Sequence, residues 1–346
     1  MPAIIRSEFA LALNQVATER GIDPKIVLET IEAAILAAYK KDYGSDEIEE
    51  IKITIDANTG EAKVFKDNKD ITPAGFGRIA AQTAKQVILQ RIREAEKKAI
   101  IADYSTRVNS IVNGMVLRFD NANVIIDIGR AEGVMPPQEQ IPNERYRLNQ
   151  RLTFYIESIR ETPRGNEIIV SRAHKGLVAA LFKREVPEVN NNSVEIKEIA
   201  REPGNRTKIA VSSTQSGVDP VGSCVGQKGV RVQAVINELG GIEKIDIIQW
   251  NDDTKLFIPA ALAPARDIET VVDEKKKTAL AYVPDDQLSL AIGKDGQNVR
   301  LAAKLTGYKI DIKSKSEKDK AKESKVKVKS TKTKSKKEKT EAKKSE

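Results

Sequence analysis

Two short glycine loops are the parts of this chain whose residue types and spacing could do chemistry. The first reads Gly226-Gln227-Lys228-Gly229 and the second reads Gly293-Lys294-Asp295-Gly296. Two glycines allow a sharp turn and let another backbone approach without interference from Cβ atoms. A helical pattern follows the second glycine of each loop, so free N–H groups and the positive end of the helix dipole would face that approach. The loops therefore predict contacts with a sugar-phosphate backbone.

Other interpretations of the loops can be weighed from sequence. A Walker A phosphate loop is excluded, because neither loop has Gly-Lys-Ser/Thr at the required spacing. A plain helix-turn-helix corner, whose glycines serve only packing, is the competing interpretation, since short glycine spacings often arise by chance. Two loops in equivalent surroundings favour the phosphate clamp over the corner.

The surroundings of the loops repeat, and a repeat sets the architecture. In each copy two strand patterns and a short helix precede the loop, and a helix and the strand text Lys-Ile-Asp-Ile follow it. The order helix-strand-strand-helix-helix-strand is that of type II KH domains, and the KH loop clamps about four nucleotides of single-stranded RNA. We assign the first copy to residues 175–249 and the second copy to residues 250–313. No linker separates them, so we expect them to pack together.

The expected elements follow from apolar periodicity and glycine punctuation. In the first copy they are a helix at 175–184, strands at 194–202 and 208–213, helices at 221–225 and 230–239, and a strand at 244–248. In the second copy they are a helix at 255–262, strands at 268–273 and 278–283, helices at 287–292 and 299–305, and a strand at 309–312.

Side chains beside the loops are further candidates for RNA contact. Gln227 and Lys228 are expected to be exposed, while Val225 and Val230 are expected to point inward. Two arginines in the first turns of the following helices complete the set of candidate RNA-binding residues, which is Gly226, Gln227, Lys228, Gly229, Arg231, Gly293, Lys294, Asp295, Gly296 and Arg300.

Residues 106–174 have a different pattern of short strands, at 111–119, 123–128, 134–135, 152–159 and 167–171. Five strands in so short a segment predict a small OB-type barrel. Residues 127–134, Asp-Ile-Gly-Arg-Ala-Glu-Gly-Val, resemble the S1 RNA-binding signature. Such barrels stack bases on surface aromatics next to basic side chains. Phe119 with Arg118 is the first candidate, and Phe154 or Tyr155 with Arg151 is the second; burial in the core is the alternative for each aromatic.

Residues 1–105 are expected to form a helical domain with a small sheet. Helices are predicted at 7–20, 24–41 and 76–104, and strands at 51–55 and 62–65. The long last helix has an apolar stripe, and its charged residues are interpreted as a solvated face.

The net charge of +8 is concentrated in the last segment. Residues 314–346 hold 14 Lys and 6 Asp plus Glu, so residues 1–313 sum to zero. Nucleic-acid binding by the folded part must therefore come from local patches. The segment lacks aromatics and has few apolar residues, so we expect a disordered tail that either solubilises the protein or contacts polyanions loosely.

One cysteine and one histidine exclude an internal disulfide and argue against a zinc site, so no cofactor or metal is expected. Cys224 is expected to be a small buried helix residue, and His174 is expected to be exposed. No signal peptide or membrane span is visible. We expect a soluble, cytoplasmic protein.

The complete arrangement resembles the bacterial NusA family of transcription elongation, termination and antitermination factors. The resemblance covers residues 1–313 and is most specific at residues 78–87, 219–226 and 292–302. It implies that the first domain binds RNA polymerase core, with Arg78, Gln82 and Lys85 as candidate contacts, and that the barrel and both KH copies hold nascent RNA. It also implies a monomer without catalysis that works with other elongation and antitermination factors and affects pausing, termination and antitermination.

The sequence departs from the family pattern in two places. The segment between Ala62 and Phe76 is shorter than in many relatives, and a basic tail stands where some relatives have acidic repeats.

An RNA-processing enzyme is one alternative function class. It would need clustered carboxylates for metal ions, whereas the acids here are scattered or paired with lysines. A ribosome-associated RNA-binding protein remains the other alternative.

Overall fold

The computed structural model describes residues 24–43, 51–56, 59, 61–66, 69–163 and 165–317 of the chain. The chain divides into two compact units, Met1–Thr106 and Arg107–Glu346. The helix expected at residues 7–20 lies outside the described residues. Among those that are described, no helix is long and apolar enough to cross a membrane.

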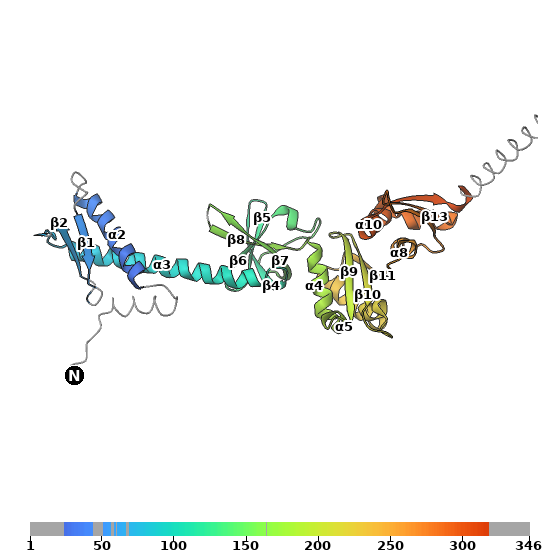
Figure 1. Ribbon diagram of the computed structural model, residues 1–346, viewed down its shortest axis with the longest axis horizontal. Helices are drawn as coiled ribbons and strands as arrows, with labels where there is room; N and C mark the ends of the chain where they lie inside the picture. Colours follow the sequence, from blue (N-terminus) through green and yellow to red (C-terminus); the bar gives the residue numbers. More distant parts are fainter. Residues whose placement is uncertain are drawn as a thin grey trace, which may run out of the picture. The chain divides into compact units, whose positions relative to one another are not determined.

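In the described part of the first unit, two helices and a small sheet lie together (Figure 1), and they pack around a mainly aliphatic core that includes Phe76. Helices α2 (Pro24–Tyr43) and α3 (Phe76–Thr106) confirm the predicted helices at 24–41 and 76–104. The elements between them are β1 (Ile51–Ile55), β2 (Ala62–Lys66) and β3 (Lys69–Asp70), which form an antiparallel sheet. Buried residues recur every fourth position along α3, at Phe76, Ala80, Ala84 and Ile88. This spacing puts one side of the helix in the core and leaves the opposite side exposed.

The second unit begins with a closed five-stranded barrel in the order β4-β5-β6-β8-β7. Its strands are β4 (Ile111–Asp120), β5 (Asn123–Asp127), β6 (Glu132–Met135), β7 (Arg151–Thr162) and β8 (Gly165–Ser171). A turn of 3-10 helix, η1 (Pro137–Glu139), follows β6. Neighbouring strands are antiparallel except β6 and β8, which are parallel. A register shift between Val116 and Arg118 interrupts the β4–β5 ladder just before Phe119.

The two predicted copies follow the barrel, and each has the expected order of elements. The first copy consists of α4 (Lys175–Glu185), α5 (Pro187–Asn190), β9 (Val194–Glu202), β10 (Arg206–Ser213), α6 (Pro220–Val225), η2 (Gln227–Gly229), α7 (Val230–Glu238) and β11 (Lys244–Gln249). The second copy consists of α8 (Thr254–Ala261), β12 (Glu269–Asp273), β13 (Thr278–Val283), η3 (Asp285–Gln287), α9 (Leu288–Ile292), η4 (Lys294–Gly296), α10 (Gln297–Thr306) and β14 (Lys309–Ser314).

Both copies have the same sheet topology. The first two strands of each copy pair antiparallel, and the last strand pairs parallel to the middle one. Strand β14 includes Ser314, and residues 315–317 form a helical turn, so regular secondary structure extends past the predicted boundary at residue 313. The rest of the predicted tail, residues 318–346, lies outside the described part of the chain.

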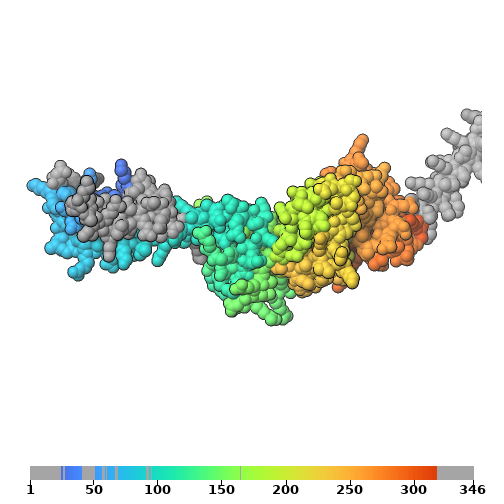
Figure 2. Space-filling view, turned by 90° about the horizontal axis from the view of Figure 1, so that it is seen from below, coloured from blue at the N-terminus to red at the C-terminus, as the bar shows by residue number. Residues whose placement is uncertain are grey.

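The two copies share one hydrophobic cluster. Ala200, Ala210 and Ile248 of the first copy lie in the same buried group as Phe257 and Leu301 of the second. In the space-filling view the first copy, yellow, and the second, orange, form a continuous surface (Figure 2). A common core fixes the positions of the two loops relative to each other, because moving one copy would expose apolar surface.

Candidate nucleic-acid interface

The two glycine loops have the same backbone conformation. Gly226 and Gly293 have φ/ψ angles of 75°/172° and 74°/172°. Lys228 and Asp295, at the third position of each loop, are left-handed with φ of 52°. The second glycines are left-handed as well. Three of the four loop residues have positive φ angles, which explains why two of them are glycines. The two loops have the same backbone angles although their side chains differ, so the conformation is a property of the repeated unit.

The first glycine of each loop is also required by close packing. A Cβ atom on Gly226 would lie 2.7 Å from Cγ of Arg231, and one on Gly293 would lie 2.7 Å from Cβ of Asn298. Gly229 and Gly296 have more open surroundings. The first glycine therefore lets the loop lie against the following helix, and the second supplies the left-handed turn into it.

The loops present backbone donors and exposed polar side chains at the same place. Helices α7 and α10 begin after Gly229 and Gly296 without a side-chain cap. The first N–H of each helix, on Val230 or Gln297, donates to a loop carbonyl, of Gln227 or Lys294. The other N–H groups of a first helical turn have no partner within the helix and attract anions. The residues between the glycines are all exposed at the surface of the loops: Gln227, Lys228, Lys294 and Asp295. This geometry suits a phosphate group.

Of the two valines beside the first loop that were expected to point inward, Val230 does not. Val230 is 67% exposed, and Val225 is only half-buried. The left-handed turn at Gly229 brings the chain into α7 with Val230 on the outer side. Near the second loop, Leu290 and Ile292 are also exposed. Each loop thus has apolar surface beside its polar residues, and ribose or base rings could pack on it.

The two arginines after the loops are held by carboxylates. Arg231 Nη1 lies 2.9 Å from Oε2 of Glu188 on α5. Arg300 Nε lies 2.6 Å from Oε1 of Glu202, the last residue of β9. Hydrogen bonding from Arg300 holds the pKa of Glu202 below its usual value, although partial burial opposes this. The part of Arg231 and Arg300 in RNA contact stays a prediction.

Of the aromatic candidates in the barrel, only one is on the surface. Phe119 is 50% exposed, whereas Phe154 and Tyr155 are buried and belong to cores. Next to Phe119, the Arg118 guanidinium donates to both carboxylate oxygens of Glu132, at 2.8 Å and 2.7 Å. The register shift before Phe119 is of the kind found where a bulge re-aims a neighbouring side chain.

His174 was expected to be exposed, but the structure shows that it is not. His174 is half-buried and caps α4, because its Nδ1 accepts a hydrogen bond from Gly176 N at 3.0 Å. Its ring stacks on Tyr155 with centroids 4.8 Å apart. Cys224 is buried as predicted, and burial raises the pKa of its thiol to about 11. Across the described ranges, no three His, Cys, Asp or Glu side chains gather into a group that could hold a metal ion.

The candidate polymerase contacts lie on the exposed side of α3. Arg78, Gln82 and Lys85 are all exposed and follow one another at helical spacing. Leu89 continues the same stripe and is 45% exposed. The stripe lies opposite the buried residues of α3, so its side chains do not contribute to the core of the first unit.

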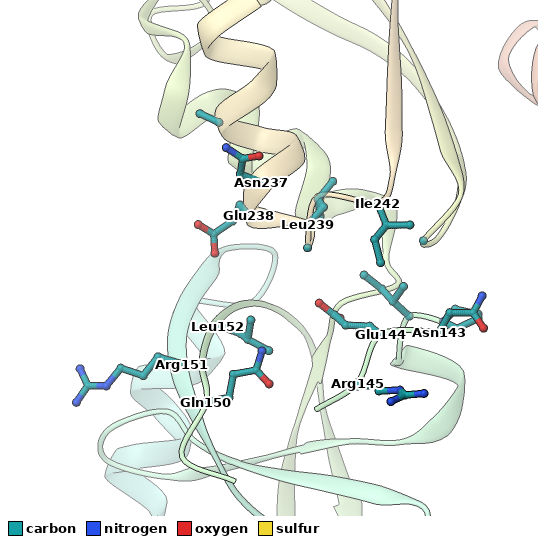
Figure 3. A pocket seen from close by; sticks show the side chains of 15 residues that line it. Asn143, Glu144, Arg145, Gln150, Arg151, Leu152, Asn237, Glu238, Leu239 and Ile242 are labelled. Carbon is teal, nitrogen blue, oxygen red and sulfur yellow. The ribbon is translucent and has the colours of Figure 1, made fainter. Parts of the chain in front are cut away.

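A cleft of about 670 Å³ between the barrel and the first copy was not predicted. Figure 3 shows Gln150 and Leu152 of the barrel facing the end of α7, where Asn237 and Glu238 are followed by Leu239. Beside the cleft, buried Arg172 joins the two domains, with Nε 2.8 Å from Glu144 Oε2 and Nη2 3.1 Å from the carbonyl of Glu238. Sequence periodicity gives no sign of a cleft between domains.

Three domain families match this chain. The NusA N-terminal domain matches residues 8–74 and 67–98, the NusA-like first KH domain matches 172–250, and the NusA-like second KH domain matches 254–320. The fold and the loops therefore define a mixed α and β protein in which a NusA-type N-terminal domain precedes two KH domains.

Curated relatives match over most of their length and carry the name transcription termination/antitermination protein NusA. The protein from Halalkalibacterium halodurans is 43% identical over 345 residues, covering 90% of this chain and 90% of its own. Those from Bacillus subtilis and Thermus thermophilus are 44% and 40% identical, covering 90% and 88% of this chain and 92% and 89% of their own. The chain belongs to the NusA family, which confirms the resemblance inferred from sequence.

Among solved structures, the N-terminal domain of NusA from B. subtilis is 32% identical. It covers 27% of this chain and 99% of its own, with a TM-score of 0.23, which is too low to support an argument from shape.

Proposed function

We propose that this protein is an RNA-binding transcription factor that associates with RNA polymerase and nascent RNA and modulates pausing, termination and antitermination. The observation that carries the proposal is the duplicated loop, which places backbone N–H groups and exposed polar side chains at two sites on one connected unit. Family membership supports the transcriptional role, since the curated relatives bear the name transcription termination/antitermination protein. In this proposal the protein acts by binding and is not itself an enzyme.

Each domain has a part in this proposal. Residues 1–105 bind the polymerase core through the α3 stripe, which contains Arg78, Gln82 and Lys85. The barrel is an S1 domain of OB type that stacks RNA on Phe119 beside Arg118, and the two copies are type II KH domains that clamp the RNA backbone. The protein works in the cytoplasm as a monomer alongside other elongation and antitermination factors.

Affinity purification of the full chain from its host tests the proposal. We expect RNA polymerase core to co-purify, with nuclease treatment leaving that association intact because it is made by the first domain. Recovery of ribosomes in place of polymerase would support the ribosome-associated alternative. Replacing Arg78 and Lys85 with Glu should reduce polymerase recovery, while Lys97→Glu, an exposed residue outside the stripe on the same helix, serves as the matched control.

A further inference from the structure

The two copies use different side chains at the same position behind the glycine loop. Counted from the first glycine of each loop, Arg231 in the first copy corresponds to Asn298 in the second. Each is the residue that a Cβ atom on that glycine would meet, at 2.7 Å in both copies. Each therefore lies directly behind its loop, in the first turn of the helix that follows it.

Arg231 fastens the first loop from behind. Its Nη1 donates to the carbonyl oxygen of Ser223 at 2.7 Å and to Glu188 Oε2 at 2.9 Å. Ser223 lies on α6, the helix before the loop, and Glu188 lies on α5. One side chain thus joins the helix before the loop, the helix after it and a third element of the same domain. Its aliphatic stem occupies the space that Gly226 leaves open.

Asn298 makes the equivalent connections in the second copy. Its Nδ2 donates to the carbonyl oxygens of Leu290 and Ala291 on α9, at 3.2 Å and 3.0 Å, and of Leu262 at the end of α8, at 2.9 Å. Carbonyls at helix ends lack partners within the helix, so such donors fasten them. The side chain is 1% exposed, and its Oδ1 has no hydrogen-bond partner among the described residues. An unpaired buried acceptor is unfavourable, and the donor bonds of Nδ2 offset that cost.

We infer that Arg231 and Asn298 are positioning residues that hold the two glycine loops in their left-handed conformation, and that neither contacts phosphate itself. For Arg231 this replaces the RNA contact expected from the sequence. This inference rests on the proposed RNA-binding function of the loops. Asn298 is neutral and buried, so the second copy performs this task without a charge. The charge of Arg231 is already matched by Glu188, and its hydrogen bonds are directed into the protein. A loop fixed in advance loses less entropy when it binds RNA, which raises affinity.

The test uses the full chain with Arg231→Ala, Arg231→Asn and Asn298→Ala. Amide hydrogen exchange is measured without RNA, and affinity for a mixed-sequence single-stranded oligoribonucleotide is measured over a series of salt concentrations. In Arg231→Ala we expect faster exchange at residues 226–232, with the loop at 293–299 as an internal control that does not change. Asn298→Ala should give the reverse pattern, and Arg231→Asn should restore part of the protection because the second copy uses Asn there.

RNA affinity should fall about tenfold in each alanine variant, which corresponds to about 1.4 kcal/mol. The slope of log K against log salt should not change. A slope flattened by about 0.7 in Arg231→Ala would show a direct phosphate contact and overturn the inference. Unchanged loop exchange in both alanine variants would overturn it as well. Faster amide exchange in the loop together with wild-type RNA affinity would instead overturn the proposed RNA-binding function of that loop. The positioning of the loop would then have no effect on RNA binding.

Discussion

Glu202 and Arg300 form an ion pair that joins the two copies. Glu202 ends β9 of the first copy, and its carboxylate accepts hydrogen bonds from Arg300 Nε at 2.6 Å and Nη2 at 3.2 Å. Gln297, at the start of α10, donates to the same carboxylate at 2.9 Å. An acidic residue of the first copy thus lies beside the loop of the second, where an RNA phosphate would compete with it for Arg300.

Glu202→Gln should therefore increase RNA affinity. The substitution removes the carboxylate that competes with phosphate for Arg300, and we expect a gain of roughly threefold at low salt, since ion pairs at the protein surface are weak. Glu198→Gln is the matched control, because Glu198 is an exposed acid on the same strand. Equal effects of the two substitutions in filter-binding or anisotropy titrations would mean that only the net charge matters and that Arg300 makes no contact.

Exchanging the third residue of the two loops tests the phosphate clamp. Lys228 and Asp295 share φ of 52°, so each backbone already accommodates the residue of the other, and Asp tolerates the left-handed region well. Lys228→Asp should lower RNA affinity about tenfold, and adding Gln227→Asp should lower it further, because two acids would then face the phosphate. Asp295→Lys should raise affinity, and Lys294→Asp should cost less than the double change in the first loop.

Circular dichroism and thermal melting provide the folding control for the loop variants. All four residues lie at the surface of the loops, so we expect changes in stability of about 0.5 kcal/mol or less. If the Gln227→Asp/Lys228→Asp variant binds RNA with wild-type affinity, the first loop is a helix-turn-helix corner whose glycines serve only packing.

The repeated order of elements could be predicted because local patterns carry it. Apolar periodicity indicated the strands and helices, and the paired loops indicated the repeat and its domain type. Partners distant in sequence could not be predicted. Sequence patterns predict that charged residues are exposed, yet three of them are fully buried: Arg172, Lys208 and Glu243. They are buried because each meets a counter-charge from another segment, as Lys208 meets Asp246 at 3.2 Å.

Single side chains near the candidate site show the same limit. Val230 was expected inward from its apolar character, but the left-handed turn at Gly229 decides its direction and exposes it. His174 caps a helix through Nδ1, a role that sequence rules assign to Ser, Thr, Asp or Asn. The carboxylates that pair with Arg231 and Arg300 are Glu188 and Glu202. Both are far from their arginines in the sequence, so local patterns cannot predict the pairing.

Phe119→Ala should weaken RNA binding without changing stability. The ring is half exposed on the barrel, and stacking of one base on an aromatic ring contributes about 1–3 kcal/mol, so a loss of at least about fivefold is expected. Leu148→Ala is the matched control, since Leu148 is an exposed apolar residue of the barrel region that cannot stack. If both variants bind RNA like the wild type, the barrel does not provide a stacking platform.

Removal of residues 318–346 should change the salt dependence of RNA binding. Those residues carry 13 Lys and 5 Asp plus Glu, whereas the ion pair of Lys315 with Glu269 and the hydrogen bond of Ser316 to Asp285 remain. Affinity for arbitrary RNA should fall at low salt, and the slope of log K against log salt should flatten by about 0.7 for each phosphate that the shortened protein no longer neutralises. The melting temperature should stay the same. An unaltered slope would assign the segment a spacer role.

Arg201 and Glu243 form a buried ion pair within the first copy that should make its stability depend on pH. Arg201 Nε and Nη2 lie 2.8 Å and 2.9 Å from the two carboxylate oxygens, and the side chains are 2% and 0% exposed. Burial favours the protonated acid, but hydrogen bonds from Arg201, Thr207 and Gly204 N outweigh it and hold the pKa of Glu243 below its usual 4.5. Folding therefore favours the ionised form.

Glu243→Gln should lower the free energy of unfolding by about 3 kcal/mol at neutral pH, because Arg201 keeps a buried charge without a counter-charge. The contribution of the wild-type carboxylate is complete above the unfolded-state pKa of about 4.5 and is lost as the pH falls through the lower folded-state pKa. Urea unfolding of both proteins between about pH 7 and pH 3 should therefore show a constant difference that narrows only below about pH 4.5. Glu195→Gln, in an exposed pair with Lys197, is the control and should change stability by about 0.5 kcal/mol or less. A difference that widened toward acid pH would mean that the folded protein binds the proton at Glu243 more tightly than the unfolded chain does.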